Sequence, residues 1–188
     1  MSIASEVPIF TIGHSTRTIE EFVDLLRVGA VEILIDVRTV PRSRRNPQYN
    51  EDLLPAELAR YQLQYQRIPE LGGLRGRSAE IPPETNAMWQ NRSFHNYADY
   101  ALSAGFDDAL RQLMHLASTR RCAIMCAEAV WWRCHRRIIA DYLLSRGRSV
   151  FHLMGPSRVE QARLTPGAKI EGDKLTYPPS DARTDPPV

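Results

Sequence analysis

Residues 122–147 read CAIMCAEAVWWRCHRRIIADYLLSRG and join two kinds of hydrophobic pattern. The first five residues form a short apolar run, which is typical of a strand that is buried on both faces. After a loop, a helical pattern begins near Arg133 and ends at Gly147. Its apolar residues share one helix face: Ile138, Ile139, Tyr142 and Leu143. This stretch therefore predicts a buried strand followed by a helix.

The same alternation runs through the rest of the chain. Further short apolar runs, which we interpret as strands, cover residues 8–12, 31–37, 63–68 and 150–154. Helical patterns cover residues 18–29, 52–61 and 94–117. Thr18 and Glu21 have the spacing of a capping box at the start of the first, and we expect a break at Gly105 in the third. Strands that alternate with helices predict an α/β fold with a mainly parallel sheet, three-layered and Rossmann-like.

The length and composition favour one soluble domain. The chain has 188 residues, near the usual domain size, and we expect a single α/β domain over residues 1–177. Residues 71–91 show no periodicity and are rich in glycine and proline, which indicates a long irregular connection that is either a binding loop or simply mobile. The proline-rich segment 178–188 lacks core-forming residues, so we expect a disordered tail.

Composition also bounds the location and the partners. No apolar run approaches the roughly 18 residues of a membrane span, and the N-terminus shows no secretion signal, so we expect a cytoplasmic protein without a membrane partner. Three clustered cysteines, at 122, 126 and 134, do not make a disulfide framework, which predicts reduced thiols. A net charge of +2 leaves any affinity for nucleic acid to local patches.

The densest group of reactive side chains follows the strand at 122–127. Ligands bind parallel sheets at the carboxyl ends of the strands, which makes Cys126, Glu128, Cys134 and His135 candidate catalytic residues. A thiol near a helix N-terminus and several arginines is favoured as a thiolate. Glu128 would either neutralise those arginines or act as a general base. The alternative is that both thiols and His135 are packed structural residues, with the neighbouring tryptophans capping the core or stacking on a planar ligand.

Two further groups are candidate anion-binding residues. Residues 36–45, DVRTVPRSRR, follow the second strand and therefore open at the same sheet edge. Guanidinium groups bind phosphate or carboxylate in a bidentate manner, so we select Arg38, Arg42 and Arg44 there, with Arg136 from the helix. Solvated loop charge is the alternative, although Asp36 can pair with only one arginine. The backbone N–H groups of Gly13, His14 and Ser15 offer a weaker anion site before the first helix.

Taken together, these segments resemble the family called domain of unknown function 488. The segments that carry the resemblance are Thr11–Ser15, Asp36–Arg38 with Pro41–Arg44, Leu71–Gly73, Tyr97–Asp99, and Cys126–Glu128 with Cys134–Arg136. The resemblance covers residues 9 to 177 and implies a small α/β protein, but it does not imply an activity. Thiol phosphatases and sulfurtransferases also place a cysteine after a strand, with five residues before an arginine. Cys126 and Arg133 have six residues between them, so we do not transfer that mechanism.

Three functions are compatible with these residues. The first is an enzyme that acts on a phosphate-bearing small molecule or nucleic acid, with arginines binding the anion and Cys126 or Glu128 performing the chemistry. The second is a metal-binding protein that uses Cys126, Glu128, Cys134 and His135, with His14 as a further ligand. The third is a noncatalytic nucleic-acid-binding module that uses the arginine loop and a stacking tryptophan. The sequence selects no particular cofactor.

Overall fold

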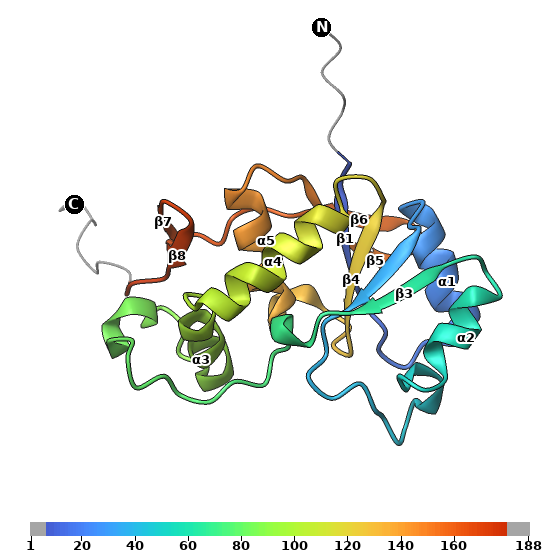
Figure 1. Cartoon of the computed structure of the whole chain (residues 1–188), viewed down its shortest axis with the longest axis horizontal. Helices are drawn as coiled ribbons and strands as arrows, with labels where there is room; N and C mark the ends of the chain where they lie inside the picture. Colours follow the sequence, from blue (N-terminus) through green and yellow to red (C-terminus); the bar gives the residue numbers. More distant parts are fainter. Residues whose placement is uncertain (1–6, 180–188) are drawn as a thin grey trace, which may run out of the picture.

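The computed structural model describes residues 7–179 and contains a six-stranded sheet between two layers of helices (Figure 1). The strand order is β3-β2-β4-β1-β5-β6, in which five strands are parallel and β6 is antiparallel to β5. The strands are β1 (Ile9–Gly13), β2 (Ile33–Asp36), β3 (Gln64–Arg67), β4 (Cys122–Cys126), β5 (Val150–Gly155) and β6 (Arg158–Gln161). The predicted α/β fold with a mainly parallel sheet is confirmed.

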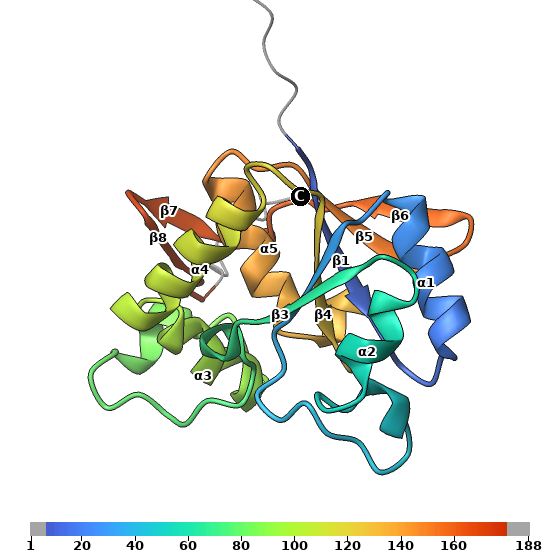
Figure 2. The same cartoon turned by 45° about the vertical axis from the view of Figure 1, so that its right-hand side comes forward.

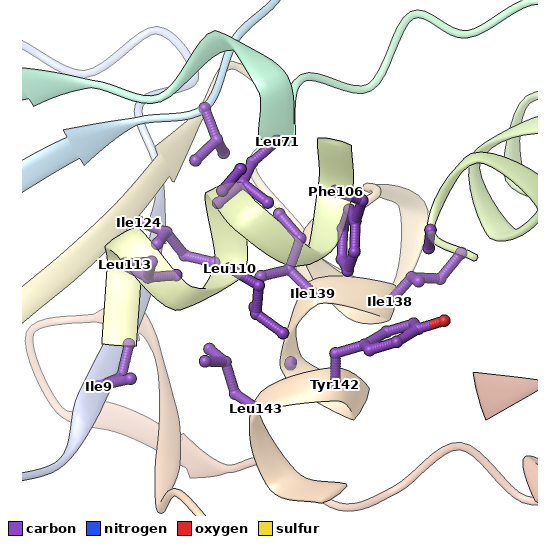
Figure 3. Packing of buried hydrophobic residues seen from close by; sticks show 14 of the residues in the cluster. Ile9, Leu71, Phe106, Leu110, Leu113, Ile124, Ile138, Ile139, Tyr142 and Leu143 are labelled. Carbon is purple, nitrogen blue, oxygen red and sulfur yellow. The ribbon is translucent and has the colours of Figure 1, made fainter. Parts of the chain in front are cut away.

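The helices cover opposite faces of this sheet. One face packs against α1 (Ile19–Val28) and α2 (Leu54–Ala59), and the other against α3 (Arg92–Tyr100), α4 (Ala104–Leu116) and α5 (Arg136–Ser145). Successive side chains of a strand point to opposite faces, so β4 supplies Met125 to the α1 side and Ile124 to the α4 side. Figure 3 shows Ile124 packed among apolar side chains of α4 and α5. Both faces of β4 are therefore buried, as its continuous apolar run predicts.

The start of α1 follows from its sequence. The Thr18 hydroxyl accepts a hydrogen bond from the Glu21 amide at 3.2 Å, and the Glu21 carboxylate accepts one from the Thr18 amide at 2.9 Å. This reciprocal capping box satisfies two of the amides that an isolated helix leaves unpaired, and such a cap contributes about 1 kcal/mol. The helix ends at Val28, before Gly29, as predicted.

The helical pattern at 94–117 divides earlier than predicted. The break covers residues 101–103 and not Gly105, which is the second residue of α4. Ser103 caps the new helix, because its hydroxyl accepts from the Phe106 amide at 3.3 Å. The capping hydroxyl, and not the glycine, therefore sets the boundary.

Three short strands were not predicted because their sequences are polar. They are β6 and the hairpin of β7 (Lys169–Glu171) and β8 (Lys174–Thr176), which turns at Gly172 with a φ of +59°. Figure 2 shows this hairpin beyond α4 and α5, where the Tyr142 hydroxyl donates to the Leu175 carbonyl at 3.3 Å. Most of the predicted tail, residues 180–188, lies outside the described residues. Within 7–179, no helix is long and apolar enough to cross a membrane.

Candidate functional site

Two thiols and an imidazole meet where β4 ends and α5 begins. Cys126 is the last residue of β4, while Cys134 and His135 lie between a short turn, η4 (Trp131–Arg133), and α5. His135 Nδ1 is 3.9 Å from Cys126 Sγ and 3.6 Å from Cys134 Sγ, and all three atoms lie within 4.8 Å of one another. We call these three residues the thiol–imidazole cluster. It brings together three of the four side chains that the sequence selected as catalytic.

The backbone of neighbouring segments orients the imidazole of His135. Its Nε2 lies 3.3 Å from the Val37 carbonyl, which can only accept, so Nε2 carries a proton and Nδ1 is the ring nitrogen that faces the thiols. Gly73 packs against the same ring, and a Cβ atom there would lie 2.5 Å from Nδ1. The ring is therefore held between the end of β2 and the loop after β3.

Arg136 connects the cluster to β1. Its guanidinium is 1% exposed and donates to Cys134 Sγ at 3.3 Å, to the Glu128 carbonyl at 2.5 Å and to the Thr11 hydroxyl at 3.4 Å. The Thr11 hydroxyl in turn lies 2.7 Å from Nδ1 of His152. The sequence selected Arg136 as an anion-binding residue, and the structure places it inside the protein, where Cys134 is its nearest potential anion.

The two thiols of the cluster differ in acidity. Burial alone would raise the pKa of the Cys134 thiol, but the hydrogen bond from Cys126 and the positive charge of Arg136 lower it well below the ordinary value. The hydrogen bond to Cys134 and burial both raise the pKa of Cys126. The pair therefore favours a thiolate on Cys134 with the proton on Cys126. Cys122, at the other end of β4, has its pKa raised to about 11 by burial.

A cavity of about 300 Å³ opens over the cluster. Its walls include the apolar side chains of Val40, Leu74 and Phe94, and its polar lining includes Glu128 and Arg133. Both of these charged side chains are exposed, and neither makes an ion pair or hydrogen bond with another side chain among residues 7–179. Glu128, the fourth predicted catalytic residue, thus lines the cavity without joining the cluster.

The end of β2 forms a separate polar group beside the cluster. Arg38 is 5% exposed and pairs with the fully buried Asp36 at 2.6 Å. Its guanidinium also donates to the Tyr49 carbonyl at 2.7 Å and lies 3.3 Å from His14 Nε2, while the Tyr65 hydroxyl donates to Asp36 at 2.8 Å. Asp36 thus pairs with one arginine, Arg38, whose charge is neutralised inside the protein although its side chain lines part of the cavity.

The other predicted anion-binding side chains of this loop lie on the surface. Arg42 and Arg44 are exposed, and neither lines the cavity over the cluster. Arg42 lies 3.8 Å from the Glu51 carboxylate, whereas Arg44 makes no ion pair with a described residue. The structure therefore does not bring these two side chains to the cluster.

The backbone of Gly13, His14 and Ser15 packs against the loop after β4. The His14 and Ser15 amides donate to the Cys126 and Ala127 carbonyls at 2.9 and 3.0 Å, so these two N–H groups are not free for an anion. A Cβ atom on Gly13 would lie 1.8 Å from the Glu128 carbonyl, which explains the glycine. Burial lowers the pKa of His14 to about 4, so its ring is neutral and structural.

A comparison with models of protein families shows to which family this chain belongs. The family model described as "Domain of unknown function DUF488" matches residues 18–143, two thirds of the chain. The chain belongs to this family. The DUF488 match contains the whole thiol–imidazole cluster together with Asp36 and Arg38. Comparisons with curated proteins and with solved structures gave no match.

Sequence reasoning missed two groups that shape the site of this DUF488 chain. The Val37 carbonyl and Gly73 orient His135, and only the Leu71–Gly73 motif of the resemblance drew attention to the second. The two tryptophans after β4 differ in their surroundings. Trp131 stacks on His152 with ring centroids 4.5 Å apart and donates to Glu160 at 2.8 Å, whereas Trp132 is 40% exposed.

Proposed function

We propose that Cys126, Cys134 and His135 bind a divalent transition metal and that the protein is an enzyme which uses this metal on a small anionic substrate. The observation that carries the proposal is the convergence of Cys126 Sγ, Cys134 Sγ and His135 Nδ1 within 4.8 Å of one another. Two thiols and an imidazole are a ligand set that zinc prefers, and the residues of the cluster are buried or half-buried, away from competing bulk water.

The two sulfur–nitrogen distances in the cluster suit tetrahedral zinc. Zn–S bonds of about 2.3 Å and Zn–N bonds of about 2.0–2.1 Å place sulfur and nitrogen about 3.6 Å apart in a tetrahedral site. In the structure, His135 Nδ1 lies 3.6 Å from Cys134 Sγ and 3.9 Å from Cys126 Sγ. Three protein ligands leave one coordination position for water or substrate, which is the arrangement of catalytic zinc sites.

Groups around the ligands support the same role. The Val37 carbonyl fixes the tautomer of His135 that offers Nδ1 to a metal, as outer partners of metal-binding histidines do. The Arg136 N–H group on Cys134 Sγ reduces the negative charge that two thiolates would place on the metal. The cluster thus has an oriented imidazole and a charge-compensating donor before any metal binds.

The cavity suggests how a substrate would be held. Arg133 contributes to its lining a guanidinium that has no partner among the described residues, which suits a carboxylate or phosphate group. Val40, Leu74 and Phe94 suit an apolar portion of the substrate. The Glu128 carboxylate lines the same cavity and would serve as a general base there, while a bound metal would supply Lewis-acid activation. A phosphate-bearing small molecule remains the leading substrate class, with Arg133 in the role that the sequence gave to the arginine loop.

Metal analysis tests the proposal directly. Freshly purified protein should contain close to one zinc ion per chain, and Cys126→Ser, Cys134→Ser and His135→Ala should each lower zinc affinity at least tenfold in competition with a chromogenic chelator. Cys122→Ser is the matched control, because Cys122 is equally buried on the same strand but outside the cluster. A parent protein that binds no divalent metal stoichiometrically, or an equal loss in Cys122→Ser, would contradict the proposal.

Thiol chemistry is the second candidate, favoured by the Arg136 N–H group 3.3 Å from Cys134 Sγ. If it holds, the parent protein is metal-free as purified, and brief alkylation at neutral pH modifies Cys126 or Cys134 before Cys122. Preferential modification of Cys122 would reject it. Among the described residues, the nucleic-acid-binding alternative is supported by exposed arginines such as Arg42 and Arg44 and by the exposed Trp132, none of which belongs to the thiol–imidazole cluster.

A further inference from the structure

A second cavity, of about 280 Å³, lies on the other side of α3 from the thiol–imidazole cluster. The first turn of α3 separates the two spaces: Ser93 and Phe94 line the cavity over the cluster, whereas Arg92 and His95 line the second one. Arg77, from the long loop after β3, and Trp89 complete the charged and aromatic part of its wall. We propose that this second cavity binds a phosphate group, independently of the metal site.

The first argument is an excess of positive charge without protein partners. Arg77 and Arg92 are exposed, and neither side chain makes an ion pair or hydrogen bond with another described residue. Asp99, the carboxylate of this cavity, does not neutralise them, because it accepts from the Asn86 amide at 2.8 Å and lies 3.7 Å from His95 Nε2. Two guanidiniums facing one cavity are the usual recognition groups for a phosphate.

The second argument is an unsatisfied donor in the same wall. Trp89 is 9% exposed, and its indole N–H is buried and has no acceptor among residues 7–179. Such a group can only donate, and leaving it unpaired costs about 1–3 kcal/mol. Less than 1 Å² of this nitrogen is exposed, so an anionic oxygen bound beside Trp89 would supply the acceptor that the described residues lack only after a small movement of the ring.

The aromatic ring of Trp89 also narrows the ligand class. One of its faces stacks on Phe94 with centroids 4.9 Å apart, and the Arg137 guanidinium lies over the ring at 4.9 Å. Tyr177 also packs against this ring with centroids 5.2 Å apart, so Phe94, Arg137 and Tyr177 already occupy much of the surface on which a base could stack. The cavity should therefore recognise the phosphate group itself and not a nucleobase.

The capping of α3 shows that the proposal does not depend on free helix amides. The Asn91 side chain already accepts from the Ser93 and Phe94 amides at 2.9 and 3.3 Å. The proposal therefore rests on the guanidinium donors of Arg77 and Arg92 and on the Trp89 indole, not on the helix amides.

A titration with inorganic phosphate at constant ionic strength tests this site. In ¹⁵N–¹H spectra, the Trp89 indole resonance, assigned with Trp89→Phe, should shift with phosphate in the parent and in Arg133→Ala alike, because Arg133 lines only the cavity over the thiol–imidazole cluster. Arg77→Ala and Arg92→Ala should each weaken phosphate binding about tenfold or more, since hydrogen bonds to charged groups contribute about 1.5–3 kcal/mol. Arg45→Ala, which removes an exposed arginine outside both cavities, should bind phosphate like the parent.

The result that overturns the proposal is an unchanged phosphate affinity in the Arg77→Ala, Arg92→Ala double variant, or a titration that leaves the Trp89 indole unmoved. Cys134→Ser separates this inference from the proposed metal site. That variant should bind phosphate as the parent does even though it has lost the metal, and a parallel loss of both would show that the phosphate site is not independent.

Discussion

The ends of β2 and β4 lie side by side at one edge of the sheet, yet their polar groups are used in opposite ways. At the end of β2, Asp36 and Arg38 bind each other, and the remaining bonding positions are taken by Tyr49, Tyr65 and His14. At the end of β4, the two thiols and Nδ1 of His135 face one another, the Arg136 guanidinium and a cavity.

This difference separates a structural cluster from a candidate site. A buried charge costs several kcal/mol unless it is fully paired, and the β2 cluster meets that requirement within the protein. The thiol–imidazole cluster gathers groups that are good metal ligands but modest hydrogen-bonding partners for one another. A metal would therefore stabilise this cluster more than the polar group at the end of β2. Their pairing thus indicates a structural role for Asp36 and Arg38, although they lie at the edge of the sheet where ligands usually bind.

The largest expected effect is on the β2 cluster. Asp36→Ala leaves the buried Arg38 without its carboxylate, so we expect the free energy of unfolding to fall by about 3–5 kcal/mol in urea titration. Asp24→Ala is the control, because it breaks the exposed Arg27–Asp24 pair and should cost at most about 1 kcal/mol. Similar losses in the two variants would remove the distinction between a buried scaffold and an ordinary surface pair.

A pH dependence of stability follows from His14. Burial holds its folded-state pKa at about 4, below the unfolded value of 6.5, so the unfolded chain binds the proton first as the pH falls. Stability from this residue is complete above pH 6.5 and is lost between pH 6.5 and 4, by about 2 kcal/mol from pH 7 to pH 5. His14→Gln should show a shallower decline than the parent by this amount, and the exposed His115→Gln should match the parent. An equal slope in all three proteins would show that His14 does not stay neutral.

A smaller change tests the thiol–imidazole cluster without altering any of its three proposed metal-binding side chains. Gly73→Ala places a methyl group 2.5 Å from His135 Nδ1, so the ring must move, and we expect zinc affinity to fall about tenfold. Gly76→Ala is the matched control, because a Cβ atom there meets nothing within 4 Å. Chelator competition measures both variants, and equal affinities would mean that the position of His135 does not govern metal binding.

The smallest expected effect is that of Arg44→Ala. Arg44 is exposed and unpaired among the described residues, so its removal should change the free energy of unfolding by no more than about 0.5 kcal/mol. Its predicted role in anion binding is measured separately, by phosphate titration at two salt concentrations. A salt-sensitive loss of phosphate affinity would show that the arginine loop contributes to anion binding. An unchanged phosphate affinity would instead support Arg77 and Arg92 as the phosphate-binding residues.

The sequence predicted the parts of the fold and site that depend on neighbours along the chain. The apolar run of β4, the capping box of α1 and the approach of Cys126 to Cys134 and His135 all follow from short-range patterns. The rest depends on strand order. Because β2 lies beside β4, the Val37 carbonyl reaches His135. Because Arg38 turns inward to pair with Asp36, its positive charge is not available to a ligand. The contact between Val37 and His135 has no signal in the local sequence, and the polar strands β6 to β8 have none either. The local sequence indicated that Asp36 pairs with one arginine, but not which one.

X-ray absorption at the zinc edge of the purified protein tests the central claim most directly. The account predicts two sulfur neighbours at about 2.3 Å and two nitrogen or oxygen neighbours at about 2.0–2.1 Å, with one sulfur lost in Cys126→Ser and none in Cys122→Ser. A bound zinc surrounded only by nitrogen and oxygen, or a sulfur shell unchanged in Cys126→Ser, would show that the thiol–imidazole cluster is not a metal centre.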